Sequence, residues 1–214
     1  MDRVIFESIF SFFEMLISLF FATGIFRKKL DGERAMLALI LFSVFGAVLL
    51  TLREYVFRWL PDIVPAVLIF TLYAIGICRA KWWAAVSWSL VNYLFIGIIV
   101  IGVDYISRIY MGSFVEMEGT VGAIWFFPHI LMRIGQLLLA EIILCVWERF
   151  PESTIVHRGN WKIMIVSSIS IILLWILLGK DADLNEEVLY SNSLICLLVF
   201  AINLSFLLFD EVLA

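Results

Sequence analysis

The chain consists largely of apolar blocks that are long enough to cross a lipid bilayer. The hydrocarbon core is about 30 Å thick, and an α-helix crosses it with roughly 20 residues at about 1.5 Å each. Because 64% of the 214 residues are hydrophobic and only 16% are charged, a water-soluble globule with a polar surface is excluded. The period-2 alternation typical of a membrane β-barrel is missing. The sequence therefore predicts an all-α integral membrane protein.

We expect one transmembrane domain over residues 1–214, with seven helices separated by charged or turn-forming connections. The expected helices cover residues 4–26, 35–56, 62–79, 83–105, 124–147, 163–180 and 190–209. The third is only just long enough to cross, although Arg79 and Lys81 can extend towards the headgroups. The first block is too long and too acidic for a secretory signal peptide, so we expect it to remain in the mature protein.

Basic residues indicate the orientation of this bundle, because Lys and Arg are retained on the cytoplasmic side. They are concentrated after the first, third and fifth expected helices, at Arg27, Lys28, Lys29, Arg34, Arg79, Lys81, Arg149, Arg158 and Lys162. The amino terminus is therefore expected outside, and seven crossings place Ala214 in the cytoplasm. Tryptophans, which prefer membrane boundaries, fit this orientation: Trp59 and Trp125 at the outer side, and Trp82, Trp83, Trp147 and Trp161 at the inner side.

The first expected helix carries a polar stripe inside an otherwise apolar stretch. On a helix that turns about 100° per residue, Glu7, Ser11, Glu14 and Ser18 fall within a sector of roughly 60°. Glu14 lies near mid-bilayer, where an ionised side chain costs several kcal/mol unless it is paired, hydrated or protonated. We therefore expect the stripe to face protein and not lipid.

Arg133 is the expected partner of Glu14, because it is the only basic residue deep within an expected helix. The hypothesis is a buried polar cluster that joins the first and fifth expected helices. Candidate ligand-binding or signal-coupling residues share a position inside the membrane and a strong hydrogen-bonding group: Glu7, Glu14, Asn92, Arg133, Gln136, Glu141 and Asn203. Three roles stay open for them: fixing the helix packing, moving protons or ions, and sensing a ligand.

No catalytic, metal or cofactor motif occurs in the sequence, and nothing indicates nucleic-acid binding. The histidines His129 and His157 are expected on opposite sides of the membrane, so they cannot share a metal ion. The cysteines stand alone inside apolar runs and are expected to be buried apolar residues: Cys78, Cys145 and Cys196. We expect neither a cofactor nor a metal, and the sequence leaves open whether the chain belongs to an enzyme.

Three further features qualify this picture. The outer connection 106–123 is long, and it is expected either to fold over a ligand or to lie at the membrane surface. Pro61 and Pro128 are expected near helix starts, where proline is tolerated. The last residues continue a helical pattern without a stop signal, so 210–214 are expected to begin a cytoplasmic linker helix.

The first helix FESIFSFFEMLISLFFATGIFRKK, the short basic inner connections and the acidic extension of the last helix resemble the membrane sensor half of Agr-type peptide-pheromone receptor histidine kinases of Gram-positive bacteria. The resemblance implies a bacterial cytoplasmic membrane, an extracellular peptide or small ligand, a cytoplasmic kinase module reached through the last helix, and a homodimer. The chain has no phosphoacceptor-histidine region and no ATP-binding domain, so no catalytic residue is carried over. It is either a fragment or a stand-alone membrane domain.

Two other functions fit the same pattern. A small transporter or channel also can have seven helices with the amino terminus outside, although the internal repeat usual in transporters is missing. An assembly subunit that binds a partner membrane protein through tryptophan-rich surfaces is the third possibility.

Overall fold

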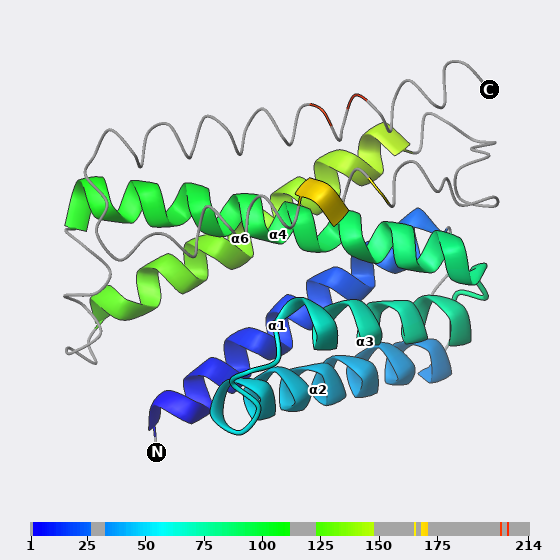
Figure 1. Ribbon diagram of the computed structural model, residues 1–214, viewed down its shortest axis with the longest axis horizontal. Coiled ribbons are helices and arrows are strands. Elements are labelled where there is room, and N and C mark those ends of the chain that lie inside the picture. Colours follow the sequence, from blue (N-terminus) through cyan, green and yellow to red (C-terminus); the bar gives the residue numbers. More distant parts are fainter. Residues whose placement is uncertain are drawn as a thin grey trace.

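The fold is all-helical in a computed structural model that describes residues 2–26, 33–111 and 123–147, together with 165, 168–170, 202 and 205. No strand occurs among these residues. The helices of the described part are α1 (Asp2–Ile25), α2 (Glu33–Tyr55), α3 (Ile63–Gly76), α4 (Trp82–Met111) and α6 (Ala123–Trp147) (Figure 1).

These helices lie at the first five positions where the sequence predicted them. In the described part, four of them are long and apolar enough to cross a membrane, namely α1, α2, α4 and α6. The fifth, α3, has 14 residues and is about 21 Å long, shorter than the hydrocarbon core. The expected helices 163–180 and 190–209 lie outside the described residues apart from a few isolated positions. The count of seven helices and the orientation therefore stay predictions.

The helices close a ring in the order α1, α2, α3, α4, α6 and back to α1, and α1 runs diagonally across its neighbours (Figure 1). Helices α1 and α6 run parallel, because Phe6 meets Phe126 near their starts and Gly24 meets Leu144 near their ends. Helix α2 is antiparallel to α1, since its last residue, Tyr55, contacts Glu7. We call this end of the bundle, where α1 and α6 begin and α2 ends, the Glu7 end.

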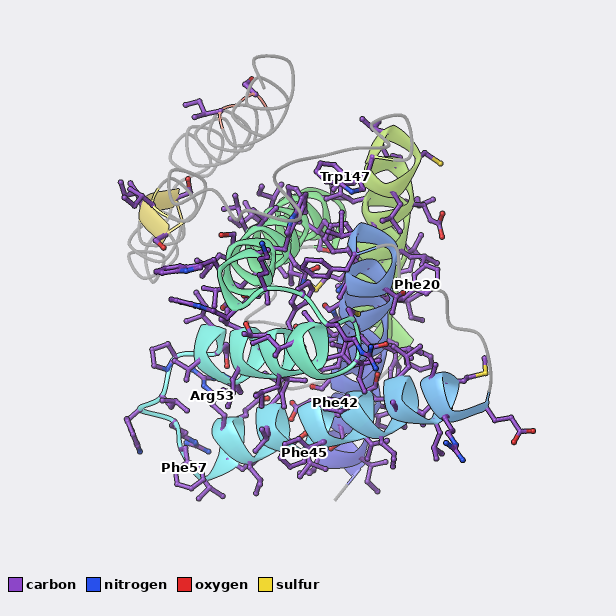
Figure 2. The ribbon with its side chains drawn as sticks, turned by 90° about the vertical axis from the view of Figure 1, so that its right-hand side faces the viewer. Phe20, Phe42, Phe45, Arg53, Phe57 and Trp147 are labelled. Atoms are coloured by element: carbon purple, nitrogen blue, oxygen red, sulfur yellow. The ribbon has the colours of Figure 1, made fainter. Side chains whose placement is uncertain are left out.

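The core is apolar and centred on aromatic side chains of α1, α4 and α6. Phe21 packs edge-on against Trp88 and Phe95, and Trp88 packs edge-on against Trp147 with ring centroids 4.9 Å apart. Trp147, which was expected at the inner boundary, is the last residue of α6 and lies in the core with 7% of its surface exposed, next to α4 in Figure 2. Its place follows from the helix phase, which turns this last residue of α6 towards the ring interior.

Small residues let the helices approach closely, as in other membrane bundles. A Cβ atom on Gly46 of α2 would lie 2.7 Å from Cγ of Met15 on α1, well inside van der Waals contact. A Cβ atom on Gly24 of α1 would lie 2.5 Å from Cδ2 of Leu144 on α6. By contrast, a Cβ atom on Gly102 of α4 would meet nothing within 4 Å. Helix α1 therefore depends on glycine contacts on two sides.

Helix α3 is short because it starts deep in the bundle. Its first residue, Ile63, packs against Leu94, which lies near the middle of the apolar stretch 82–103 of α4. Its end is set by a sharp turn in which Arg79 adopts the left-handed conformation with φ 58°. The helix therefore covers 63–76 and not the expected 62–79.

Pro128 lies near the start of α6, as expected, but beyond the first turn, where proline is best tolerated. The helix begins at Ala123, so a full turn precedes the proline. Pro128 lacks the N–H that would donate to the carbonyl four residues earlier, and α6 therefore continues through one missing backbone hydrogen bond.

The packing at Gly46 predicts that Gly46→Val destabilises the fold by about 1–3 kcal/mol, because the added methyl groups must displace Met15. For a chain of this size, each kcal/mol lowers the melting temperature by about 2–4 °C. The melting temperature in detergent measures this. Gly102→Val is the matched control and should change the melting temperature far less, and equal losses in both variants would contradict the close approach of α1 and α2.

Candidate functional site

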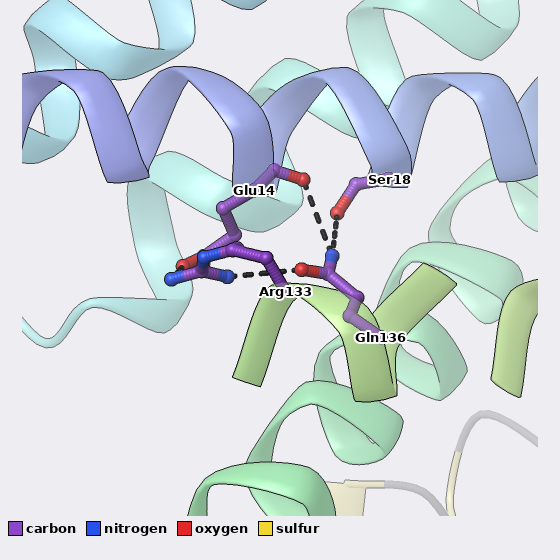
Figure 3. Close-up of polar contacts among 4 residues, drawn as sticks. All are labelled: Glu14, Ser18, Arg133 and Gln136. Carbon is purple, nitrogen blue, oxygen red and sulfur yellow. Dashed lines mark hydrogen bonds and ion pairs between the residues drawn. The ribbon is translucent and has the colours of Figure 1, made fainter. Parts of the chain in front are cut away.

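The site is built around Glu14, which lies in the middle of the apolar stretch of α1 and turns towards α6. Arg133 of α6 meets it, with 2.5 Å between its Nη2 atom and Oε2 of Glu14 (Figure 3). Each of the two side chains is 16% exposed, so water screens the pair only weakly. The predicted pairing of Glu14 with Arg133 is confirmed. It forms because α1 and α6 run parallel and bring their middle turns to the same level.

Gln136 extends the ion pair into a network. Its Oε1 accepts a hydrogen bond of 2.9 Å from Nη1 of Arg133. Its Nε2 donates to the backbone oxygen of Glu14 at 3.2 Å and to Oγ of Ser18 at 3.1 Å (Figure 3). Gln136 is 5% exposed and Ser18 is 1% exposed. We call these four residues the Glu14 network; it has no net charge and ties one face of α1 to one face of α6.

Helical spacing explains why these residue types meet. Glu14 and Ser18 are four residues apart on α1, and Arg133 and Gln136 are three apart on α6, so each pair shares a helix face. Arg133 nevertheless keeps its buried Nε without a hydrogen-bond partner among the described residues. A buried donor without a partner costs free energy, and the network is therefore held in place by tight packing and not by complete hydrogen bonding.

A second ion pair, which the sequence analysis did not find, lies in the connection between α2 and α3. Nη1 of Arg53 is 2.6 Å from Oδ1 of Asp62, and its Nε donates to the backbone oxygen of Leu60 at 2.5 Å. Figure 2 shows Arg53 between α2 and α3. Asp62 occupies the N-cap position of α3 but makes no side-chain cap hydrogen bond. Arg53 thus fixes the connection from which α3 begins.

The two ion pairs influence one another. Partial burial raises the pKa of Asp62, the positive charge of Arg53 opposes this, and the negative charge of Glu14 raises it further. With Arg133, these residues place charged groups of α1, α2 and α6, and of the connection that begins α3, in two neighbouring ion pairs.

Of the remaining residues that the sequence analysis proposed, one lies beside the Glu14 network and the others do not. Asn92 of α4 is 9% exposed and lines, with Gln136, a cavity of about 10 Å³. That volume corresponds to roughly one water molecule, so Asn92 lies beside the Glu14 network. Glu7 lies apart, because its Oε2 accepts a hydrogen bond from the Tyr55 hydroxyl of α2.

Glu141 is exposed on the outside of α6 and does not join the network. It follows Gln136 by five residues, which on a helix corresponds to a rotation of about 140°, so the two cannot face α1 together. Asn203 lies outside the described residues, as does most of the connection 106–123. The structure thus brings together Glu14, Arg133 and Gln136, with Asn92 next to them.

The described residues include no group of three or more His, Cys, Asp or Glu side chains that could hold a metal ion. His129 stacks on Phe10 of α1 with ring centroids 5.0 Å apart, as expected for a residue at a helix interface. Cys78 and Cys145 are not in disulfide bonds, and the expectation that Cys145 is buried is wrong, because it is exposed on α6.

No protein-family model, curated protein or solved structure matches this chain. The function must therefore be argued from the chemistry of the site. The site consists of a buried ion pair that the Gln136 side chain bridges. It can hold two helices in one register, and it can release them when either charge is neutralised or finds another partner.

The geometry predicts that Glu14→Gln and Arg133→Gln each destabilise the protein strongly, by about 3–5 kcal/mol, because each leaves the opposite charge buried and unpaired. The exchange variant Glu14→Arg with Arg133→Glu should recover part of that loss. The melting temperatures of the wild type, the two single variants and the exchange variant in detergent give the coupling free energy between Glu14 and Arg133.

Glu141→Gln is the matched control for this cycle, because it removes a carboxylate from the exposed face of α6. It should change stability by much less than Glu14→Gln. Additive losses, with no recovery in the exchange variant, would show that Glu14 and Arg133 do not depend on each other.

Proposed function

We propose that this chain is the sensor domain of a membrane receptor, in a bacterial cytoplasmic membrane. An extracellular peptide or small ligand changes how α1 packs on α6, and the last helix passes the change to a cytoplasmic histidine kinase module. The observation that carries the proposal is the buried Glu14–Arg133 ion pair between two parallel helices. Such a pair is a switch element, because its free energy depends steeply on a small relative displacement of the helices.

The size of this interaction fits a switch. Moving a two-state equilibrium from 1:99 to 99:1 takes about 5.5 kcal/mol of differential ligand affinity. Breaking a buried ion pair by removing one partner costs about 3–5 kcal/mol. A ligand whose binding free energy offsets the cost of breaking the pair therefore shifts the two-state equilibrium over most of the range from 1:99 to 99:1.

The Arg53–Asp62 pair supplies a route from a ligand to the Glu14 network. Its side chains are 23% and 53% exposed, and the neighbouring Trp59 is 78% exposed, so a ligand can reach them. Asp62 also feels the charge of Glu14. A ligand that pairs with Arg53 or Asp62 changes the field at Glu14 without entering the core. The Arg53–Asp62 pair lies at the Glu7 end, which is the outer side in the orientation expected from the basic residues.

A proton or ion transporter is the second candidate, and the same electrostatic link favours it. Two carboxylates, Glu14 and Asp62, lie within electrostatic range of each other and each faces an arginine. Carboxylates at membrane depth are a common part of proton relays. The two functions differ in one measurable respect, because a transporter moves charge across the bilayer and a sensor does not.

The proposal predicts two populated packings of α1 against α6. Spin labels at Phe20 of α1 and Ile142 of α6, both exposed, report the separation of these helices in vesicles. The distance distribution should contain two populations, and Glu14→Gln should shift nearly all molecules into one of them. Glu141→Gln is the control and should leave the distribution unchanged.

Proton flux in the same vesicles separates the candidate functions. A sensor gives no flux above protein-free vesicles, whereas flux that Glu14→Gln abolishes would replace the sensor with a transporter. If the labels give one distance, and Glu14→Gln does not change it, the ion pair has a purely structural role and the proposed switch is wrong.

A further inference from the structure

The small cavity beside the Glu14 network has two amide side chains in its wall. It lies where α1, α4 and α6 meet, and its volume is about 10 Å³. Seven of its nine lining residues are apolar, and the other two are Asn92 of α4 and Gln136 of α6. What the cavity can hold therefore depends on its size and on the hydrogen bonds that these two amides still need.

Asn92 needs a hydrogen-bond partner that the neighbouring helices do not supply. It lies in the apolar stretch 82–103 of α4 and is 9% exposed. Its side chain makes no hydrogen bond to the part of the chain that the structure describes. An amide that is removed from water without a new partner costs free energy, and neither lipid nor the apolar core can provide one. The partner of Asn92 is therefore to be found in the space that its side chain lines.

Gln136 has one hydrogen-bonding position left. Both N–H groups of its amide are used, because Nε2 donates to the backbone oxygen of Glu14 and to Oγ of Ser18 (Figure 3). Its Oε1 accepts one hydrogen bond, from Nη1 of Arg133, and an amide oxygen can accept two. The second lone pair of Oε1 therefore has room for one more donor.

Size and chemistry together select the occupant. A volume of about 10 Å³ is that of one water-sized probe, so an organic ligand does not fit. A metal cation prefers several oxygen ligands that include carboxylates, and no lining residue carries a carboxylate. An apolar occupant would leave the Asn92 amide without a partner. Water can both donate and accept, and it therefore suits both amides.

We propose that the cavity binds one water molecule, which donates a hydrogen bond to Oε1 of Gln136 and makes a second one with the Asn92 amide. The water extends the Glu14 network from α1 and α6 to α4, with Asn92 as the residue that holds it from the third helix. The site does not depend on the sensor function proposed above, because it follows from the size of the cavity and the two amides alone.

Hydroxyl-radical footprinting tests for this water in the full chain in detergent. X-ray irradiation converts a bound water into a radical that oxidises the side chains beside it, and mass spectrometry of the peptides locates the oxidation. Phe21 and Phe95 line the cavity although they are only 1% and 4% exposed. Phe70 is 2% exposed and does not line it, so it is the internal control. Phe21 and Phe95 should be oxidised roughly ten times faster than Phe70, because ordered water contacts them alone.

Two variants remove the water from different helices. Asn92→Leu removes the amide on α4, and Ala140→Val fills the cavity from α6 without changing either amide. Each should lower the oxidation of Phe21 and Phe95 to the rate of Phe70. Ser89→Ala is the matched control, because it removes a buried polar group from α4 one turn away from Asn92 and outside the cavity. It should oxidise like the wild type, and the melting temperature of each variant shows that it is folded.

Three outcomes would overturn the proposal. If Phe21 and Phe95 of the wild type are oxidised no faster than Phe70, the cavity binds no water. If their fast oxidation persists in folded Ala140→Val, the water that causes it lies elsewhere. If Ala140→Val abolishes the fast oxidation and folded Asn92→Leu retains it, Asn92 does not hold the water and the link to α4 is wrong.

Discussion

The scarcity of water inside a lipid bilayer is the constraint on which this structure depends. An ionised carboxylate in the middle of α1 is tolerated only with a partner, and Arg133 supplies the partner from α6. Because both helices must present their charged residues to each other, their relative rotation and level are fixed. The surrounding arrangement follows: Gln136 hydrogen-bonds to Arg133, to the Glu14 backbone and to Ser18, and α4 closes the ring behind it through Asn92 and the aromatic core.

This constraint is also why the centre of the site could be predicted from the sequence. Charges are rare in apolar stretches, so Glu14 had one basic candidate partner at its depth, and the pairing required no knowledge of the fold. The helices could be predicted for a similar reason, since their apolar lengths are set by the thickness of the membrane. A contact can be predicted from the sequence alone when a physical requirement, such as a partner for a buried charge, leaves one candidate residue.

Other features depend on tertiary geometry and could not be predicted. Glu7 and Glu14 share a face of α1, but α1 runs diagonally, so the first meets α2 and the second meets α6. The rotation of α6 about its axis decides that Gln136 faces inwards and Glu141 outwards. The ion pair of Arg53 and Asp62 could not be predicted, because its residues lie on either side of a short connection, where charged residues are common. Opposite charges at the two ends of that connection were the one available signal.

The short α3 has a consequence for the membrane itself. Irregular backbone is not stable against lipid hydrocarbon, yet the connection that precedes α3 ends level with the middle of α4 and exposes Trp59 and Asp62. A bilayer around these helices therefore has to bring headgroups and water down to this connection, which thins the bilayer beside α3. The free-energy cost of that thinning depends on the stiffness and chain length of the lipids.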